Sequence, residues 1–231
     1  MKLSLTLTAN AGVLLALGED GPVFGIDALH DTKTPEFSCL SPEQTENVFA
    51  LLDKTPPNVL LTTHDHADHY SRKLLEKAAA RYNGCQLISP WAEAGKKGKI
   101  YTINGHTVTA LPLAHRAAPR YPESDNYGFV IEVGGKTAFH PGDAEPLSEE
   151  MLKLAQSFHP DAAILPFLWV TLPRCRKVLD ILAPKEIAFV HLPFEEEDVG
   201  GYNRAALSAA SRFYPAAVVL NKHLQTVTFE V

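Results

Sequence analysis

Hydrophobic and polar residues along this chain recur with two periods, one typical of strands and one of helices. Leucine occupies every second position from Leu3 to Leu7, which predicts a strand with one buried face. Short continuous apolar runs, bounded by glycine, proline or polar residues, predict further buried strands. We expect strands over residues 1–8, 13–17, 23–26, 59–61, 86–88, 99–103, 106–111, 127–133, 136–139, 162–165, 186–190, 217–220 and 224–229.

Apolar residues spaced three and four positions apart predict helices between these strands. Ser41 is a helix cap, with Pro42 in the first turn and Gln44 completing a capping box. Ser148 caps another helix, and the other predicted helices include residues 71–82, 175–182 and 203–213. Strands that alternate with helices predict an α/β protein. Two sheets packed face to face, with helices outside, is one economical layering of this pattern.

Length, charge and cysteine usage narrow the class of protein. The chain has 231 residues, which suits one large domain or two small ones, and we expect a single domain over residues 1–231. Its net charge of −6 argues against nucleic acid as a partner, because phosphate binding needs a basic surface. No apolar run is long enough to span a membrane, so no membrane partner is expected. The three scattered cysteines fit a reducing cytoplasm and form no CxxC zinc site.

The candidate chemistry is concentrated in one polar run that follows the strand over residues 59–61. His64 and His66 are two positions apart, so an extended segment points both imidazoles to the same side. Asp68 and His69 come after the chain bends towards the next helix, so they aim at a different point. Two points with imidazole and carboxylate ligands indicate two metals, or one metal and a water. The alternative interpretation is a solvated polar loop, and the spacing of three histidines and an aspartate argues against it.

Three further candidate ligands stand at the ends of other apolar strands. They are His115, Asp143 and His191. His115 or His191 alone is more typical of a structural histidine, but the three residues together with the polar run indicate a site on one edge of the sheets. Gly142 lets the backbone approach closely, so the Asp143 carboxylate can reach between two ions.

The order of these motifs resembles the metallo-β-lactamase superfamily. Its HxHxDH signature is present, and the later His, Gly-Asp and His motifs follow in order, as His64, His66, Asp68, His69, His115, Gly142-Asp143 and His191. The phrase over residues 127–132, with the following Gly-Gly-Lys and Pro-Gly-Asp, looks most like the branch near the ascorbate-phosphate lactonases.

This resemblance implies a fold, a ligand set and a reaction. The fold is an αββα four-layer sandwich of two mixed sheets with helices on the outer faces. The first metal is held by His64, His66 and His115. The second is held by Asp68, His69 and His191, with Asp143 bridging the two ions. Nitrogen and oxygen donors suit Zn²⁺ or Mn²⁺, with Fe²⁺ as a further option.

The expected activity is hydrolysis of a small-molecule ester, lactone or phosphodiester by a hydroxide shared between the two ions. Asp68 or Asp143 is the expected catalytic residue that accepts a proton from this nucleophile. A nuclease of the same superfamily and a non-catalytic metal-binding protein are the alternatives. The oligomeric state stays open, with a homo-oligomer among the outcomes.

Four further residues near the candidate ligands have other candidate roles. Arg116 either meets an anionic substrate or forms a surface salt bridge. His140 either orients a ligand or is an ordinary loop histidine, which is favoured. Asp65 is a candidate hydrogen-bond partner of His64 or His66, and His30 a candidate for the mouth of the site.

Overall fold

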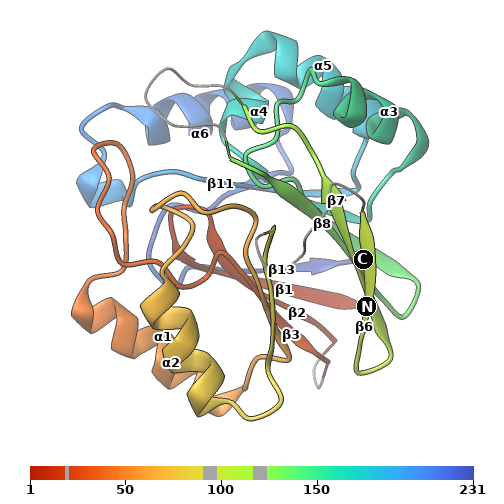
Figure 1. Ribbon diagram of the computed structural model, residues 1–231. Coiled ribbons are helices and arrows are strands. Elements are labelled where there is room, and N and C mark those ends of the chain that lie inside the picture. Colours follow the sequence, from red (N-terminus) through yellow and green to blue (C-terminus); the bar gives the residue numbers. More distant parts are fainter. Residues whose placement is uncertain (19–20, 91–97, 117–123) are drawn as a thin grey trace.

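The computed structural model describes residues 1–18, 21–90, 98–116 and 124–231, and two β-sheets form its centre (Figure 1). The first sheet has six strands in the order β13-β1-β2-β3-β4-β5. Their bounds are Lys2–Ala9 for β1, Gly12–Leu17 for β2, Val23–Ile26 for β3, Val59–Leu61 for β4, Gln86–Ile88 for β5 and Thr226–Glu230 for β13. The residues Gly-Glu-Asp-Gly at positions 18–21 predict a hairpin turn between β2 and β3, and residues 19–20 of this turn lie outside the described residues.

The second sheet has seven strands in the order β12-β11-β10-β9-β8-β7-β6. Their bounds are Lys99–Ile103 for β6, His106–Pro112 for β7, Tyr127–Val133 for β8, Lys136–His140 for β9, Ala162–Pro166 for β10, Glu186–Val190 for β11 and Val218–Val219 for β12. The predicted strands in both sheets are therefore confirmed, with their ends shifted by at most a few residues.

Both sheets are mixed, and their parallel strands place several chain segments at the same edge. In the first sheet β3, β4 and β5 are parallel, and the remaining neighbours are antiparallel. In the second sheet β9, β10, β11 and β12 are parallel, and β6 to β9 pair antiparallel. Because the carboxyl ends of parallel strands meet at one edge of a sheet, the segments after β3, β4, β9 and β11 can converge there.

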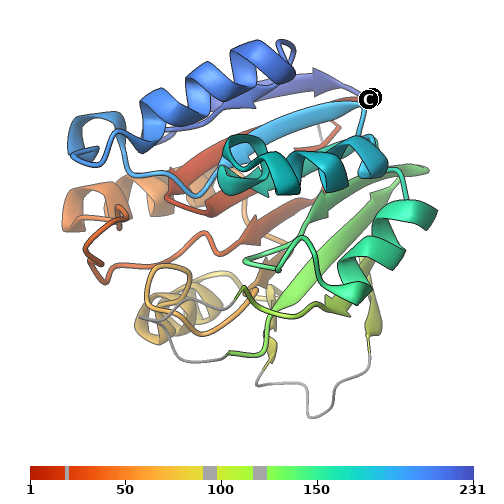
Figure 2. The same cartoon turned by 90° about the horizontal axis from the view of Figure 1, so that it is seen from above.

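Helices cover the outer faces of the two sheets (Figures 1 and 2). The first sheet is flanked by α1, Pro42–Lys54, and α2, Arg72–Arg81. The second is covered by α3, Glu149–Ser157, α4, Leu168–Thr171, α5, Pro173–Leu182, and α6, Tyr202–Phe213. The capping box at Ser41 is confirmed, because the Gln44 side-chain Oε1 accepts a hydrogen bond from the Ser41 amide. The αββα sandwich is confirmed.

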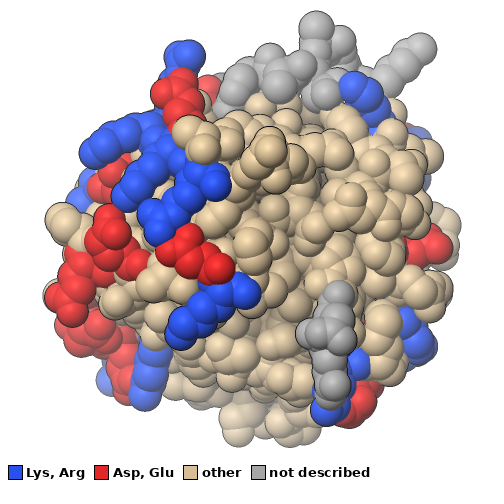
Figure 3. Space-filling model, turned by 90° about the horizontal axis from the view of Figure 1, so that it is seen from below, with Lys and Arg blue, Asp and Glu red and all other residues tan. Residues whose placement is uncertain are grey.

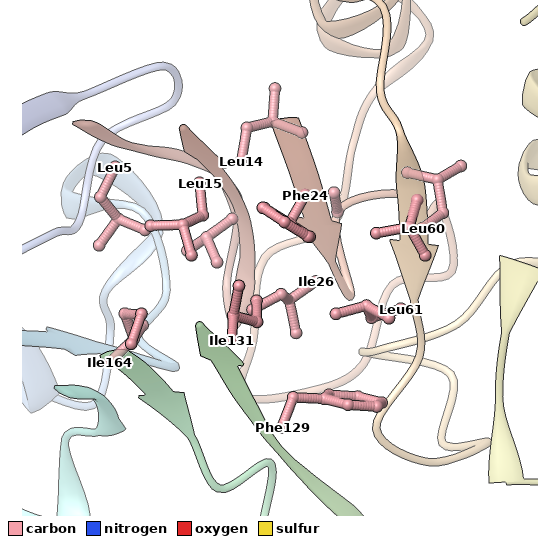
Figure 4. Packing of buried hydrophobic residues seen from close by; sticks show 14 of the residues in the cluster. Leu5, Leu14, Leu15, Phe24, Ile26, Leu60, Leu61, Phe129, Ile131 and Ile164 are labelled. Atoms are coloured by element: carbon pink, nitrogen blue, oxygen red, sulfur yellow. The ribbon is translucent and has the colours of Figure 1, made fainter. Parts of the chain in front are cut away.

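The hydrophobic core lies between the two sheets (Figure 4). Its first-sheet side chains include Leu5, Leu15 and Phe24, and the second sheet contributes Phe129 and Ile131. All five are at most 1% exposed. A second apolar cluster lies where α3–α6 pack on the far face of the second sheet. Burial on both faces explains why β10 and β11 in the second sheet are almost continuously apolar.

The surface mixes both signs of charge. Figure 3 shows basic and acidic side chains interspersed along one side of the face that it presents. Mixed charge also joins α2 to α1, through the pairs Lys77–Glu46 and Arg81–Asp53. Among the residues that the structure describes, no helix is long and apolar enough to cross a membrane.

Candidate metal centre

All seven residues that the sequence singles out as ligands lie together at the edge where the strand ends meet. The structure brings their donor atoms into three overlapping groups, each with atoms within 4.8 Å of one another. These groups are His64, His66 and His115; Asp68, His69 and His191; and His64, His69 and Asp143. The two clusters implied by the resemblance are present, and Asp143 lies between them.

The chain reaches this point from both sheets. The run over residues 64–69 follows β4 and ends where Ser71 caps α2. His115 follows β7, and an isolated bridge pairs it with Ala144, next to Asp143. His191 directly follows β11. The site therefore spans the edge of the sandwich and contains groups from each half.

The three histidines of the first cluster form a compact trio. Their ring centroids are 4.6 Å apart for His64 and His66, 4.8 Å for His64 and His115, and 4.7 Å for His66 and His115. In the second cluster the Nε2 atoms of His69 and His191 are 3.0 Å apart. Asp143 Oδ2 lies 3.3 Å from His191 Nε2, and its Oδ1 lies 3.7 Å from His69 Nε2.

Gly142 is needed for this geometry, as expected from the sequence. Its φ is +59°, which is in the left-handed region that favours glycine. A Cβ at this position would lie 2.3 Å from Asn126 Oδ1 and 2.8 Å from Thr63 Cβ. The same Asn126 Oδ1 accepts a hydrogen bond from the Asp143 amide at 3.0 Å. The turn is thus packed tightly against the ligand run.

A buried carboxylate behind the site sets the orientation of two rings. Asp27 Oδ2 accepts from His69 Nδ1 at 2.8 Å and from the Thr63 hydroxyl at 2.6 Å. With that proton donated, the hydroxyl oxygen accepts from His64 Nδ1 at 2.9 Å. Because Nδ1 of each ring is engaged by this network, Nε2 is the ring atom that each histidine directs towards the centre.

The donor set fits a cation. The Nε2 atoms of His64 and His115 and the Oδ1 atom of Asp143 are buried and have no hydrogen-bond partner. His115 Nδ1 is already engaged by the Arg116 carbonyl at 2.7 Å, so its free Nε2 also offers a lone pair. Burying such acceptors unpaired is unfavourable, and a divalent ion is the partner that would satisfy them together.

The electrostatics of the site also favour positive charge. Burial opposes a charge on His69, but the Asp143 and Asp27 carboxylates outweigh it and raise the pKa of His69 to about 10. Despite its own burial, Asp143 has a pKa well below the ordinary value because of His191 and His69. Burial lowers the pKa of His64 and of His115. The Asp143 carboxylate therefore stays ionised and available as a ligand.

Asn10 and Asp27 are site residues that the sequence analysis missed. Asn10 Nδ2 donates to the Asp68 backbone carbonyl at 3.2 Å, and the backbone carbonyl of Asn10 accepts from the His191 amide at 2.9 Å. It therefore holds two residues of the second cluster. Both Asn10 and Asp27 follow the ends of strands, β1 and β3, so the strand-end signal that indicated the ligands applies to them too.

The other histidines and the aspartate that the sequence places near the ligands lie in different surroundings. His140 is buried, and its Nδ1 accepts from the Gly142 amide at 3.0 Å, so it supports the turn that carries Asp143. Placing His30 at the mouth was wrong, because its side chain is fully buried and its Nε2 lies 3.1 Å from the Ala9 carbonyl. The hydrogen-bond partner of His64 Nδ1 is the Thr63 hydroxyl and not the Asp65 carboxylate. Asp65 instead accepts a hydrogen bond from the Ser124 hydroxyl at 2.6 Å.

Comparison with known proteins agrees with this geometry. A profile described as the Beta-lactamase superfamily domain matches residues 36–187. A UPF0173 metal-dependent hydrolase of Methanosphaerula palustris is 29% identical over 121 residues, which cover 48% of this chain and 55% of the relative. One from Thermus thermophilus is 25% identical over 169 residues, covering 66% and 74%. The chain spans about half the length of the first of these relatives.

Solved structures show the same fold. Igni18, a metallo hydrolase from Ignicoccus hospitalis, superposes with a TM-score of 0.68 at 19% identity over the full length of both chains. An isothiocyanate hydrolase from Delia radicum gut bacteria gives 0.62 at 16% identity, also over both full lengths. The finer resemblance to ascorbate-phosphate lactonases stays a prediction.

Proposed function

Because this chain belongs to the metallo-β-lactamase superfamily, we propose that it is a hydrolase that uses two divalent metal ions. Metal-dependent hydrolysis is supported by the family, by the relatives named for it and by the cluster of histidines and aspartates. The convergence of seven donor side chains in three overlapping groups is the observation that carries the proposal of two ions.

In this proposal each cluster holds one ion. His64, His66 and His115 would hold the first, and Asp68, His69 and His191 would hold the second, as expected from the motif order. Asp143, which lies between the two clusters, would contribute its carboxylate to both. Nitrogen and oxygen donors suit Zn²⁺ or Mn²⁺, and Fe²⁺ fits the same set. When bound, such ions supply a hydroxide near neutral pH and stabilise the negative charge that develops on the substrate.

The protein's own side chains keep this arrangement ready for the reaction. Asp27 and Thr63 hold the rings of His69 and His64, so those Nε2 atoms stay directed at the centre. Asp68 or Asp143 accepts a proton from the attacking water. The substrate is a small molecule with an ester, lactone or phosphodiester bond.

The test combines metal analysis with an activity panel. Purified protein should contain about two divalent ions per chain and hydrolyse at least one member of a panel of lactones, esters and phosphodiesters. Asp143→Ala should lose activity and part of the metal, whereas Glu150→Ala, which removes an exposed carboxylate on α3, should change neither. Full activity and unchanged metal content in Asp143→Ala would contradict the proposal.

A further inference from the structure

A small pocket opens directly beside the candidate metal centre. Asp143, His191 and Arg116 are its charged or titratable lining residues. The remaining wall is largely apolar and includes Leu168 and Trp169. Its cavity volume is about 30 Å³. One water-sized probe needs roughly 10–15 Å³ on this measure, so the pocket has room for two or three heavy atoms, which is enough for a carboxylate or for the leading oxygen atoms of a phosphate.

Arg116 is the feature of this pocket that the proposed reaction leaves unexplained. Its Nη1 atom is buried and has no hydrogen-bond partner. A surface salt bridge was one of the two candidate roles of Arg116. In the described part of the chain, however, Arg116 has no ion-pair partner within 4.0 Å. Glu145 is close in sequence, but its Oε1 accepts from the Leu147 amide. A buried guanidinium N–H without an acceptor is costly, which indicates that a ligand supplies one.

The backbone of Arg116 is tied to the metal centre on both sides. Its amide donates to the Asp143 carbonyl at 2.8 Å, and its own carbonyl accepts from His115 Nδ1 at 2.7 Å. The guanidinium is thereby carried by a segment whose position is set by two candidate ligands. A group bound to Arg116 in this pocket lies next to Asp143 and His191, within the space where the substrate must bind.

The charge of the pocket selects the kind of group. Asp143 and His191 are committed to the metals in the proposed function, so Arg116 is the free charge among the described lining residues. Apolar walls such as Trp169, which is 1% exposed, strengthen its interaction with an anion. An arginine presents a planar set of N–H donors that matches the oxygens of a carboxylate or a phosphate.

We propose that Arg116 binds an oxyanionic group of the substrate, a carboxylate or a phosphate, in the pocket beside Asp143 and Trp169. This inference rests on the proposed function, because it assumes that substrate is cleaved at the metal centre. The enzyme then acts on small acidic molecules and holds their charged end away from the bond that breaks.

Two esters that differ only in a distant charge test this inference. 4-Nitrophenyl butyrate is neutral, and the 4-nitrophenyl half-ester of glutaric acid has a carboxylate at the other end of a similar chain. With metal-loaded wild type, we expect kcat/KM at least tenfold higher for the half-ester. Arg116→Gln should bring this ratio close to one, Arg116→Lys should keep part of it, and Arg174→Gln, which alters an exposed arginine, should leave it unchanged.

Calorimetric titrations distinguish the two oxyanions and add a readout besides turnover. Glutarate and inorganic phosphate are titrated separately into the metal-loaded protein, and the tighter of the two identifies the anion that the pocket prefers. Arg116→Gln should weaken that binding about tenfold or more, while metal content stays at the wild-type level. The inference is overturned if wild type has equal kcat/KM for the two esters and Arg116→Gln binds the anion as tightly as wild type. This result leaves the proposed function standing.

Failure of the proposed function gives a different pattern. In that case metal-loaded wild type hydrolyses neither these esters nor the wider panel. The titrations still decide the role of Arg116, because they do not depend on turnover. If Arg116→Gln is not folded, Arg116→Lys provides the comparison, since it keeps the charge and loses the planar fork.

Discussion

The side chain of Asp27 shows how single residues set the chemistry of this site. It is buried, and it accepts hydrogen bonds from the Thr63 amide, the Thr63 hydroxyl and His69 Nδ1. Its own φ of +49° places it in the left-handed region, so the backbone is bent there to bring the carboxylate inward. One carboxylate thus orients the ligand run and one of its rings.

Replacing Asp27 should therefore weaken metal binding without removing a ligand. Asp27→Asn keeps the size of the side chain but has only one acceptor oxygen for three donors. We expect metal affinity to fall by about 10–100-fold, measured by competition with a chelator of known affinity. Glu132→Gln, an exposed change on β8, is the control. Unaltered affinity in Asp27→Asn would show that His69 does not need this partner.

Gly142 leads to a second prediction at this scale. Gly142→Ala should lower the free energy of unfolding by about 1–3 kcal/mol and also weaken metal binding, because the new Cβ meets Asn126 and Thr63. Gly135→Ala is the matched control, since its φ is +75° and nothing lies within 4 Å of its added Cβ. Chemical denaturation and metal titration of both variants separate backbone strain from the clash, and only Gly142→Ala should affect the metal.

The ligands could be predicted from the sequence, but their supporting partners could not. Histidines and aspartates clustered after several apolar strands form a pattern that is visible without coordinates. Asn10 and Asp27 are single residues after their strands, and each is informative only through contacts with residues far away in the sequence. The burial of His30 likewise depends on how the segments pack, which residue type alone does not reveal.

At the scale of elements, Asp161 joins three neighbouring segments of the second sheet. Its carboxylate accepts from the Thr137 amide at 3.0 Å and from Lys185 Nζ at 2.7 Å, with Lys136 Nζ at 3.5 Å. Thr137 and Lys136 belong to β9, and Lys185 directly precedes β11, so this side chain connects the starts of β9, β10 and β11. Burial would raise its pKa, but these partners lower it to about 2.

The lowered pKa predicts how the stability depends on pH. A carboxyl whose folded pKa lies below its ordinary value of 3.8 stabilises the fold above about pH 4, and this stabilisation is lost as the pH falls towards 2. Asp161→Asn should therefore lower the melting temperature at pH 7, with a difference from wild type that shrinks between pH 4 and pH 2. Melting curves across this range provide the measurement. A difference that stays constant over this range contradicts the assigned partners.

The elements themselves were largely predictable because their patterns are local. Alternating or continuous apolar runs indicated the strands, and Ser41 and Ser148 marked helix starts that the structure confirms. The helix α4, Leu168–Thr171, and the 3-10 helix Glu195–Glu197 were missed. Each is four residues or shorter, so neither is long enough to show a helical period.

At the scale of the whole molecule, the candidate metal centre ties the two sheets together. The run over residues 64–69 belongs to the first sheet's side, and His115, Asp143 and His191 come from the second. The main core likewise contains side chains from both sheets. For this reason we expect residues 1–231 to unfold in one cooperative transition, which is the test of the single-domain prediction.

Metal removal should lower the stability of this whole unit. An ion that binds only the folded chain at 100 times its dissociation constant adds about 2.7 kcal/mol, and about 1 kcal/mol shifts the melting temperature of a chain of this size by roughly 2–4 °C. Scanning calorimetry with Zn²⁺ or with a chelator should thus differ by at least about 5 °C. Two separate transitions, or equal melting temperatures, would contradict this view.

Strand β13 affects how the chain reaches this structure during synthesis. It pairs with β1, with Lys2 opposite Glu230, so one edge of the sheet formed mainly by early residues is closed by late ones. Until residues 226–230 have left the ribosome, β1 presents an open hydrogen-bonding edge next to a strongly apolar face. Such distant pairing is slow to form, so the unpaired edge of β1 is a site for edge-to-edge aggregation until β13 is in place.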